Sequence, residues 1–391
     1  LFPNEKVDLG VCESLSMLNI EKFLLKKLEW GDAQSIDGIT ILPLKWKSSL
    51  DMITLAQAEE KGWIEVLESE SVNVLRLRYS SPHTTLIPYL QVVMGGKQDR
   101  MVTEPIILMA SKEPEEIKTI PVNCIEQGRW QYARQSTGEQ TSPKFKVHQA
   151  RMSPTLGALN LKAEQTMTWS TIHWYQKKRG ISREVAPSQS FVELEEASKE
   201  EIEKMKQEQK VTAEQKAFLS AAGHLLPQQT GLALFIGDQL IAIELYGTPI
   251  LWREQAEAVY NSFLAELTIR EIQAKPLTTQ QAITILKKTL TTLSFQEQEA
   301  KEKGRLFTTR PTEQQEHSAL LLEYQNDLVE FYYARGQKDV FIKKQPPFPT
   351  NERIEVQQIR KPEFQTFQVQ DLQINIKEKK EEPPLMVTKA S

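Results

Sequence analysis

The first half of the chain groups its apolar positions into short runs that are rich in strand-forming residues. These runs cover residues 39–46, 63–67, 72–79, 84–94, 105–110 and 117–124, and turn-forming residues separate most of them. Ahead of them, apolar residues at helical spacing over 11–28 predict an amphipathic helix, and residues 54–61 predict a short helix between the first two strands. We therefore expect this half to be mainly antiparallel sheet.

The second half combines hairpins with helices. Residues 231–246 predict a hairpin that turns at Gly237, because Gly suits the first central position of a type II′ turn. Helices are predicted over 251–272 and 278–290, and the second of them begins with a capping-box pattern. A second hairpin at 319–333 has a pattern like that of the first, which is weak evidence for an internal duplication.

These elements predict an α+β fold with a mainly antiparallel, sheet-rich core, flanking helices, an N-terminal helix and an extended C-terminal tail. In chain order we expect an N-terminal helical extension (1–37), a sheet-rich core (38–186), a charged helical connector (187–230), a hairpin–helix–helix–hairpin part of the same domain (231–340) and an extended tail rich in Pro, Gln, Lys and Glu (341–391). In the connector, Ser198 and Glu201 predict a capped helix that ends near Gln209. The composition of the tail is typical of segments that form no packed core alone.

Charge and cysteine content narrow the class of protein. The 391 residues carry 48 Lys and Arg against 52 Asp and Glu, a formal net charge of −4. This balance excludes attachment to nucleic acid or membrane by bulk charge, and no uncharged stretch is typical of a membrane span. Cys12 and Cys124 are too few for a disulfide framework, so we expect a reducing compartment, the cytoplasm.

Several common enzyme motifs are absent from the sequence. It contains no GxGxxG after a strand, no GxxxxGK[ST], no GxSxG and no HExxH. Dinucleotide-fold dehydrogenases, P-loop enzymes, α/β-hydrolases and common zinc proteases are therefore disfavoured. The five histidines lack metal-ligand spacing, so neither a metal nor a cofactor is expected.

The first candidate site segment is G-G-K-Q-D-R at residues 95–100. Its two glycines permit a tight turn or a close approach to a ligand, and Lys97 and Arg100 supply donors for a phosphate or carboxylate. The alternative is an ordinary hairpin turn whose charges face water.

The second candidate is P-V-N-C-I-E-Q-G-R-W at residues 121–130, where a strand ends. Arg129 can hold an anion, Glu126 can accept hydroxyl protons and Trp130 can stack on a planar ring. The alternative is a buried Glu126–Arg129 pair beside a core Trp that locks the strand end. Cys124 shares strand parity with apolar neighbours, which favours a buried, inert thiol over a nucleophile.

The third candidate is Gln165, which falls on one helical face with Trp169 and Ile172. In this arrangement Gln165 accompanies an aromatic ring into a pocket. Core aromatics at helical spacing explain the same pattern equally well.

Taken in order, the three segments resemble a prokaryotic domain family of unknown function, named for its gene association with ADP-ribosylglycohydrolases and rhodanese-phosphatases. The family segments read G-x-K-Q-N-R, P-V-S-C-[VI]-E-Q-G-R-W and Q-x-x-x-W. The chain has Asp99 and Asn123 where Asn and Ser are usual. Residues 231–249 resemble a second family block, so the resemblance covers about 38–274 and is expected to extend to the hairpin at 319–333.

The resemblance implies that the segments form a site. Expected ligand-binding residues are Lys97, Gln98, Arg100, Gln127, Arg129, Trp130, Gln165 and Trp169, with Glu126 as the candidate catalytic residue. The expected ligand is a phosphorylated or nucleotide-like small molecule related to NAD or ADP-ribose, and the sequence does not decide whether the chain is an enzyme. The alternative is a structural or accessory subunit of a homo- or hetero-oligomer, in which the motif is a structural lock and the tail at 341–391 binds a partner.

Overall fold

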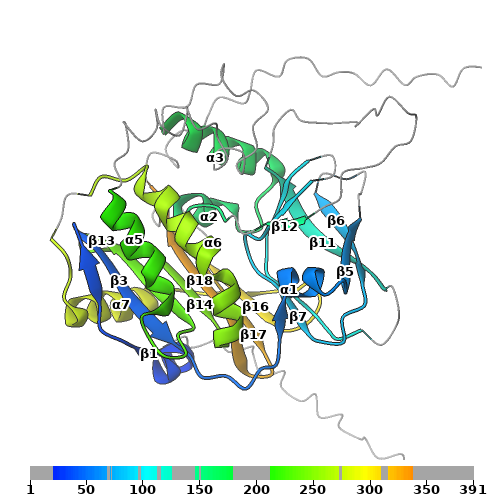
Figure 1. Cartoon of the computed structure of the whole chain (residues 1–391), viewed down its shortest axis with the longest axis horizontal. Helices are drawn as coiled ribbons and strands as arrows, with labels where there is room; N and C mark the ends of the chain where they lie inside the picture. Colours follow the sequence, from blue (N-terminus) through cyan, green and yellow to red (C-terminus); the bar gives the residue numbers. More distant parts are fainter. Residues whose placement is uncertain are drawn as a thin grey trace, which may run out of the picture. The chain divides into compact units, whose positions relative to one another are not determined.

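The computed structural model describes residues 21–67, 71, 73–95, 98–111, 116–125, 146–148, 151–178, 212–272, 275–309 and 316–337. The chain divides into one unit of residues 1–343 and another of residues 344–391, and all described residues belong to the first. They form three β-sheets with accompanying helices (Figure 1). The predicted α+β class with a sheet-rich core is thereby confirmed.

The largest sheet has nine strands in the order β1-β3-β13-β14-β18-β17-β16-β15, and β2 also pairs with β3. Its strands are β1 (Glu29–Trp30), β2 (Gln34–Ile36), β3 (Ile39–Lys45), β13 (Gly231–Ile236), β14 (Gln239–Tyr246), β15 (Gln296–Gln298), β16 (Arg305–Thr309), β17 (His317–Tyr324) and β18 (Asp327–Arg335). All of its pairings are antiparallel. This sheet therefore combines strands from both halves of the chain.

The six-stranded sheet has the order β12-β8-β9-β11-β6-β5, and the three-stranded sheet has the order β10-β7-β4. Their strands are β4 (Ile53–Thr54), β5 (Ile64–Leu67), β6 (Val74–Tyr79), β7 (Thr85–Ile87), β8 (Val92–Met94), β9 (Arg100–Val102), β10 (Ile106–Leu108), β11 (Glu116–Cys124) and β12 (Lys146–His148). Strand β11 pairs with β6 as far as Pro121 and with β9 from Val122 onwards. Pro has no N–H to donate to a ladder, which suits the point where a strand changes partners.

The described helices are the π-helix η1 (Glu21–Leu25), α1 (Leu55–Glu60), α2 (Pro154–Asn160), α3 (Gln165–Lys178), α5 (Ala213–Ala221), the 3₁₀-helix η2 (Ala222–His224), α6 (Pro249–Leu267) and α7 (Thr279–Thr292). Helices α1, α5 and α7 each begin with a capping box of Thr and Gln, at Thr54, Thr212 and Thr278. These boxes satisfy backbone N–H groups that the first turn leaves without partners.

Both faces of the nine-stranded sheet are covered by apolar packing. On β3, Ile39 and Ile41 belong to a core that includes residues of α6, whereas Leu42 and Leu44 belong to a second core with residues of α7. Figure 1 shows α5 and α6 crossing one face of the sheet and α7 lying on the other. Because a layer of helix covers each face, the strands are apolar at consecutive positions rather than only at alternate ones.

Most predicted elements are confirmed, including both hairpins, but the strand predicted at 84–94 is wrong. That segment forms β7 and β8, which belong to different sheets. Pro88 and Leu90 lie between them, and Leu90 has a φ of +65°, which breaks the extended backbone. The sequence analysis also missed α2 and α5. The helix predicted at 198–209 and the part of the N-terminal helix before residue 21 lie outside the described residues.

The two hairpins are alike in one further respect. In the β13–β14 hairpin the register shifts so that no β13 residue lies opposite Ile241. In the β17–β18 hairpin the register shifts in the same way, so that no β17 residue lies opposite Val329. The hairpins lie side by side through the β14–β18 pairing. The weak duplication signal in the sequence thus has a structural counterpart in two bulged hairpins.

Candidate functional site

A cluster of charged and aromatic side chains is buried on the large sheet, and we call it the Arg151 cluster. It contains Arg151, which lies just before α2, together with Glu244 and Tyr246 of β14 and Glu330 and Tyr332 of β18. Each of these five side chains is fully buried. In the register of the sheet, Glu244 lies opposite Tyr332 and Tyr246 lies opposite Glu330, so the four sheet residues are cross-strand neighbours.

The guanidinium of Arg151 pairs with two carboxylates in this cluster. Arg151 Nη2 lies 3.0 Å from Glu244 Oε2 and 3.6 Å from Glu330 Oε1, and Nη1 donates a hydrogen bond to Tyr246 Oη at 2.9 Å. The backbone N–H of Tyr89 donates to both oxygens of Glu330, each at 3.2 Å. With one cation for two acids, the cluster is not neutral when both acids are ionised.

Burial therefore changes the acidity of these groups. It raises the pKa of Glu244 to about 7 and the pKa of Glu330 to about 8, against the opposing effect of Arg151. Burial also raises the pKa of Tyr246 and Tyr332 well above the ordinary value for tyrosine. The cluster consequently retains a proton on one of its two carboxylates near neutral pH.

Backbone contacts hold the cluster against α2. Tyr89 Oη donates to the carbonyl oxygen of Gly157 at 2.6 Å, and the rings of Tyr89 and Tyr332 meet edge to face at 5.1 Å. A Cβ atom at Gly157 would lie 1.9 Å from Tyr332 Oη. Only glycine at this position lets α2 approach the sheet so closely.

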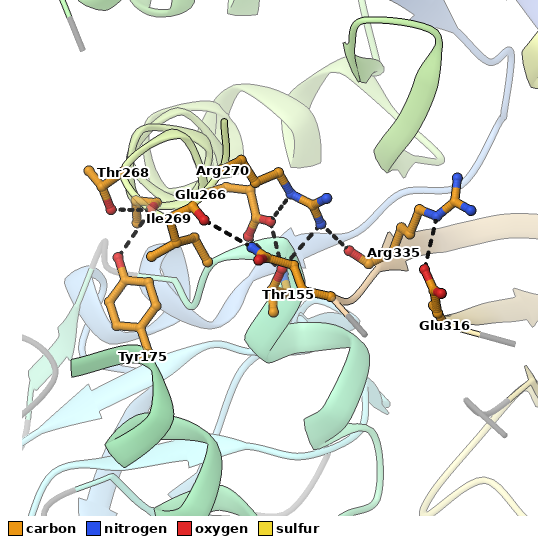
Figure 2. Close-up of polar contacts among 10 residues, drawn as sticks. Thr155, Tyr175, Glu266, Thr268, Ile269, Arg270, Glu316 and Arg335 are labelled. Atoms are coloured by element: carbon orange, nitrogen blue, oxygen red, sulfur yellow. Dashed lines mark hydrogen bonds and ion pairs between the residues drawn. The ribbon is translucent and has the colours of Figure 1, made fainter. Parts of the chain in front are cut away.

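A second polar network joins α2 to the ends of α6 and β18 (Figure 2). The N–H and hydroxyl of Thr155 donate to the two oxygens of Glu266, at 2.8 and 2.6 Å. Arg270 pairs with Glu266 one helical turn away and donates to the carbonyl oxygen of Arg335. The network thus ties the start of α2 to the same sheet that carries the Arg151 cluster.

The G-G-K-Q-D-R segment is packed inward where the structure describes it. Asp99 Oδ1 accepts a hydrogen bond from the N–H of Gly95 at 2.9 Å, and Asp99 O accepts one from Ile125 at 3.1 Å. Arg100 is fully buried and donates to the carbonyl oxygen of Val74 at 3.2 Å. The guanidinium of Arg100 therefore does not face water.

The end of β11 is joined to the start of α3 by side chains from both predicted segments. Gln165 accepts from the N–H of Cys124 and donates to its carbonyl oxygen, both at 2.7 Å. Asn123 Nδ2 donates to Ala163 O and to Thr168 Oγ1, both at 2.8 Å. The Cys124 thiol is buried, as its strand parity predicts. Asn at position 123 thus supplies donors that bridge two elements.

The structure brings together some of the predicted site residues. Arg100 lies opposite Cys124 in the β9–β11 pairing, and Gln165 bonds to the Cys124 backbone. Gln98 is buried next to this pairing, and Trp169 lies one turn along α3 with no hydrogen-bond partner for Nε1 in the described part of the chain. The remaining predicted site residues lie outside the described residues; they are Lys97, Glu126, Gln127, Arg129 and Trp130.

A groove of about 960 Å³ opens beside this joint, and we call it the motif groove. Its walls are the end of β11, the turn from α2 to α3, the first residues of α3 and the loop from β15 to β16. Asn123 and Gln165 line it. Its charged lining residues are Glu104, Lys162, Glu164, Glu299 and Lys301.

One charged pair of the motif groove was not predicted from the sequence. Lys162 Nζ lies 2.9 Å from Glu104 Oε2, and the Glu104 side chain is only 4% exposed. Neither residue belongs to a recognised segment. The only signal is structural, because Lys162 has a φ of +48°, which is unusual for a residue other than glycine.

The described residues show neither a group of side chains placed to hold a metal ion nor a helix able to span a membrane. They contain no group of three or more His, Cys, Asp or Glu side chains placed to hold a metal ion. None of their helices has both the length and the apolar character needed to cross a membrane.

The fold and the motif groove define an α+β protein in which three separated sequence segments meet at the end of one strand. The model of the ARG and Rhodanese-Phosphatase-superfamily-associated Protein domain matches residues 27–333, and the chain belongs to this family. No curated protein matches the chain. No solved structure matches it either.

The Arg151 cluster makes a prediction about pH. The pKa of Glu330 is raised from 4.5 to about 8 in the folded chain, so between these values the folded chain holds a proton that the unfolded chain has lost. The free energy of unfolding should therefore fall as the pH rises through this range, and Glu330→Gln should remove part of that fall.

Urea denaturation at several pH values checks this prediction. The stability of the wild-type chain relative to Glu330→Gln should decrease steadily from about pH 5 to about pH 8. Glu257→Gln, on the exposed side of α6, is the matched control and should follow the wild-type curve. A pH-independent difference between the wild-type chain and Glu330→Gln would show that Glu330 titrates alike in both states.

Proposed function

We propose that the chain binds a phosphorylated or nucleotide-like small molecule, related to NAD or ADP-ribose, in the motif groove. The observation that carries this proposal is a groove of about 960 Å³ beside the family segments, lined by two lysines and three carboxylates. Lys162, Lys301 and the first turn of α3 all face this space. Pockets of this size take small ligands.

The start of α3 favours an anion. Gln165 and Thr166, its first two residues, line the motif groove, and α3 continues to Lys178. A helix of this length presents the positive end of its dipole and N–H groups without intrahelical partners at its N-terminus. Lys301 is exposed and lines the same groove. These groups support the binding of phosphate oxygens.

The acidic lining residues suit the other half of a nucleotide. Glu104, Glu164 and Glu299 lie on the same groove, and carboxylates accept hydrogen bonds from sugar hydroxyls. A ligand with both anionic oxygens and hydroxyl groups therefore matches the lining better than a simple anion.

The whole chain contains only two cysteines, which supports a reducing compartment, the cytoplasm, as the location of the protein.

Lys301→Met should weaken the binding of ADP-ribose or NAD by about 3- to 10-fold, the scale of one solvent-exposed charged contact. Isothermal titration calorimetry measures this change. Lys303→Met is the matched control, because Lys303 is exposed on the same loop but does not line the groove. Absence of binding heat at millimolar ligand, with the fold confirmed by circular dichroism, would refute the proposal.

A second candidate is a non-catalytic structural or accessory role, in which the family segments act as a lock. The double hydrogen bond between Gln165 and the Cys124 backbone supports it, because such a bond joins two elements without any ligand. In that case the tail at 341–391 would carry the contact with a partner or a second copy of the chain.

Gln165→Ala tests the lock. It removes the two hydrogen bonds that Gln165 makes to the Cys124 backbone, so the free energy of unfolding should fall by about 1–3 kcal/mol. Thr166→Ala, at the exposed neighbouring position, is the control. Urea denaturation without ligand gives the values, and a Gln165→Ala chain as stable as the control would argue against the lock.

A further inference from the structure

Glu104 is a buried carboxylate whose charge is paired with Lys162. It lies in the turn between β9 and β10, its side chain is 4% exposed, and it lines the motif groove. Among the described residues, its side chain has one polar contact, the ion pair in which Lys162 Nζ lies 2.9 Å from Oε2. An ionised carboxylate can accept about four hydrogen bonds, and buried charges are normally paired and hydrogen-bonded.

Lys162 is fixed beside Glu104 by its backbone. Its N–H donates to the carbonyl oxygen of Thr103 at 3.0 Å, and its φ of +48° turns the chain sharply between α2 and α3. The ammonium group also reaches the carbonyl oxygen of Glu299 at 3.4 Å, a long contact, and its side chain remains 20% exposed. An ammonium has three donors, so Lys162 retains capacity for an anionic oxygen of a ligand.

The Glu104–Lys162 pair therefore places a hydrogen-bond acceptor and a cation side by side on the motif groove. The carboxylate can accept further hydrogen bonds, and the ammonium beside it can donate one to an anionic oxygen of a ligand. A cationic ligand would compete with Lys162 for the carboxylate, and a bare anion would give Glu104 no further hydrogen-bond donor. A sugar phosphate meets both requirements, because two vicinal hydroxyls donate to one carboxylate while a phosphate oxygen accepts from the ammonium.

We infer that Glu104 selects ligands that carry free vicinal hydroxyls, and that the motif groove binds a ribosyl phosphate. This inference rests on the proposed function and narrows it to ligands in which the ribose diol is unblocked. Lys162 positions Glu104 and contacts the phosphate. Asn123 and Gln165 fix the end of β11 to the start of α3, next to the Glu104–Lys162 pair.

Calorimetry on the full chain tests the inference with three probes: AMP, 2′,3′-dideoxy-AMP and inorganic phosphate. The wild-type chain should bind AMP at least about 10-fold more tightly than the dideoxy compound, the scale of hydrogen bonds to a charged group. Glu104→Met should bring AMP down to the level of the dideoxy compound and leave the dideoxy compound nearly unchanged. Glu257→Met is the control, an exposed carboxylate of α6 that does not line the groove, and it should leave the binding of both compounds unchanged.

The outcomes separate the two proposals. If the wild-type chain binds AMP and dideoxy-AMP equally, the inference about Glu104 is overturned and the proposed nucleotide site stands. If Glu104→Met weakens both compounds alike, Glu104 is a structural residue and the inference also fails. If no nucleotide binds, both proposals fail together. The comparison of the two probes on the wild-type chain needs no variant, so it is decisive even if Glu104→Met does not fold.

Discussion

One buried interaction, between Arg151 and the carboxylates of Glu244 and Glu330, constrains the whole arrangement of elements. A buried guanidinium is stable only when carboxylates lie close to it, because water does not solvate its charge. Removal of either the guanidinium or the carboxylates leaves an uncompensated buried charge. The two carboxylates come from β14 and β18, which are neighbouring strands in the middle of the largest sheet. The segment that leads into α2 is therefore fixed on this sheet by charge as well as by apolar packing.

The position of the motif groove follows from this anchor. After Arg151 the chain enters α2, where Thr155 bonds to Glu266 and Gly157 packs against Tyr332. It then turns at Lys162 and starts α3, whose Gln165 holds the end of β11. Each wall of the groove is thus placed by polar contacts that lead back to the large sheet. A ligand site built in this way is pre-organised, which reduces the cost of ordering it on binding.

The sequence predicted those parts of the fold that depend on a few neighbouring residues, such as turns and helix caps. Gly237 gave the first hairpin turn, and the boxes of Thr and Gln gave the start of α7, because turns and caps depend on a few neighbouring residues. The split of β7 from β8 was missed, since which sheet each strand joins depends on distant partners. Arg151, Glu104 and Lys162 have ordinary sequence surroundings, and only the tertiary fold shows that they are buried or paired. The family segments were recognised in the sequence, but the hydrogen bonds that join them could not be predicted, because they depend on how β11 and α3 meet in the fold.

The free energy of unfolding of Arg151→Met, measured by urea denaturation, tests the role of the Arg151 cluster most directly. The account predicts a loss of about 3–5 kcal/mol, because two buried carboxylates lose the cation that pairs with both of them. It also predicts that the triple variant Arg151→Met/Glu244→Gln/Glu330→Gln recovers part of this loss, since no unpaired charge remains. An Arg151→Met chain with the stability of the wild type would contradict the account.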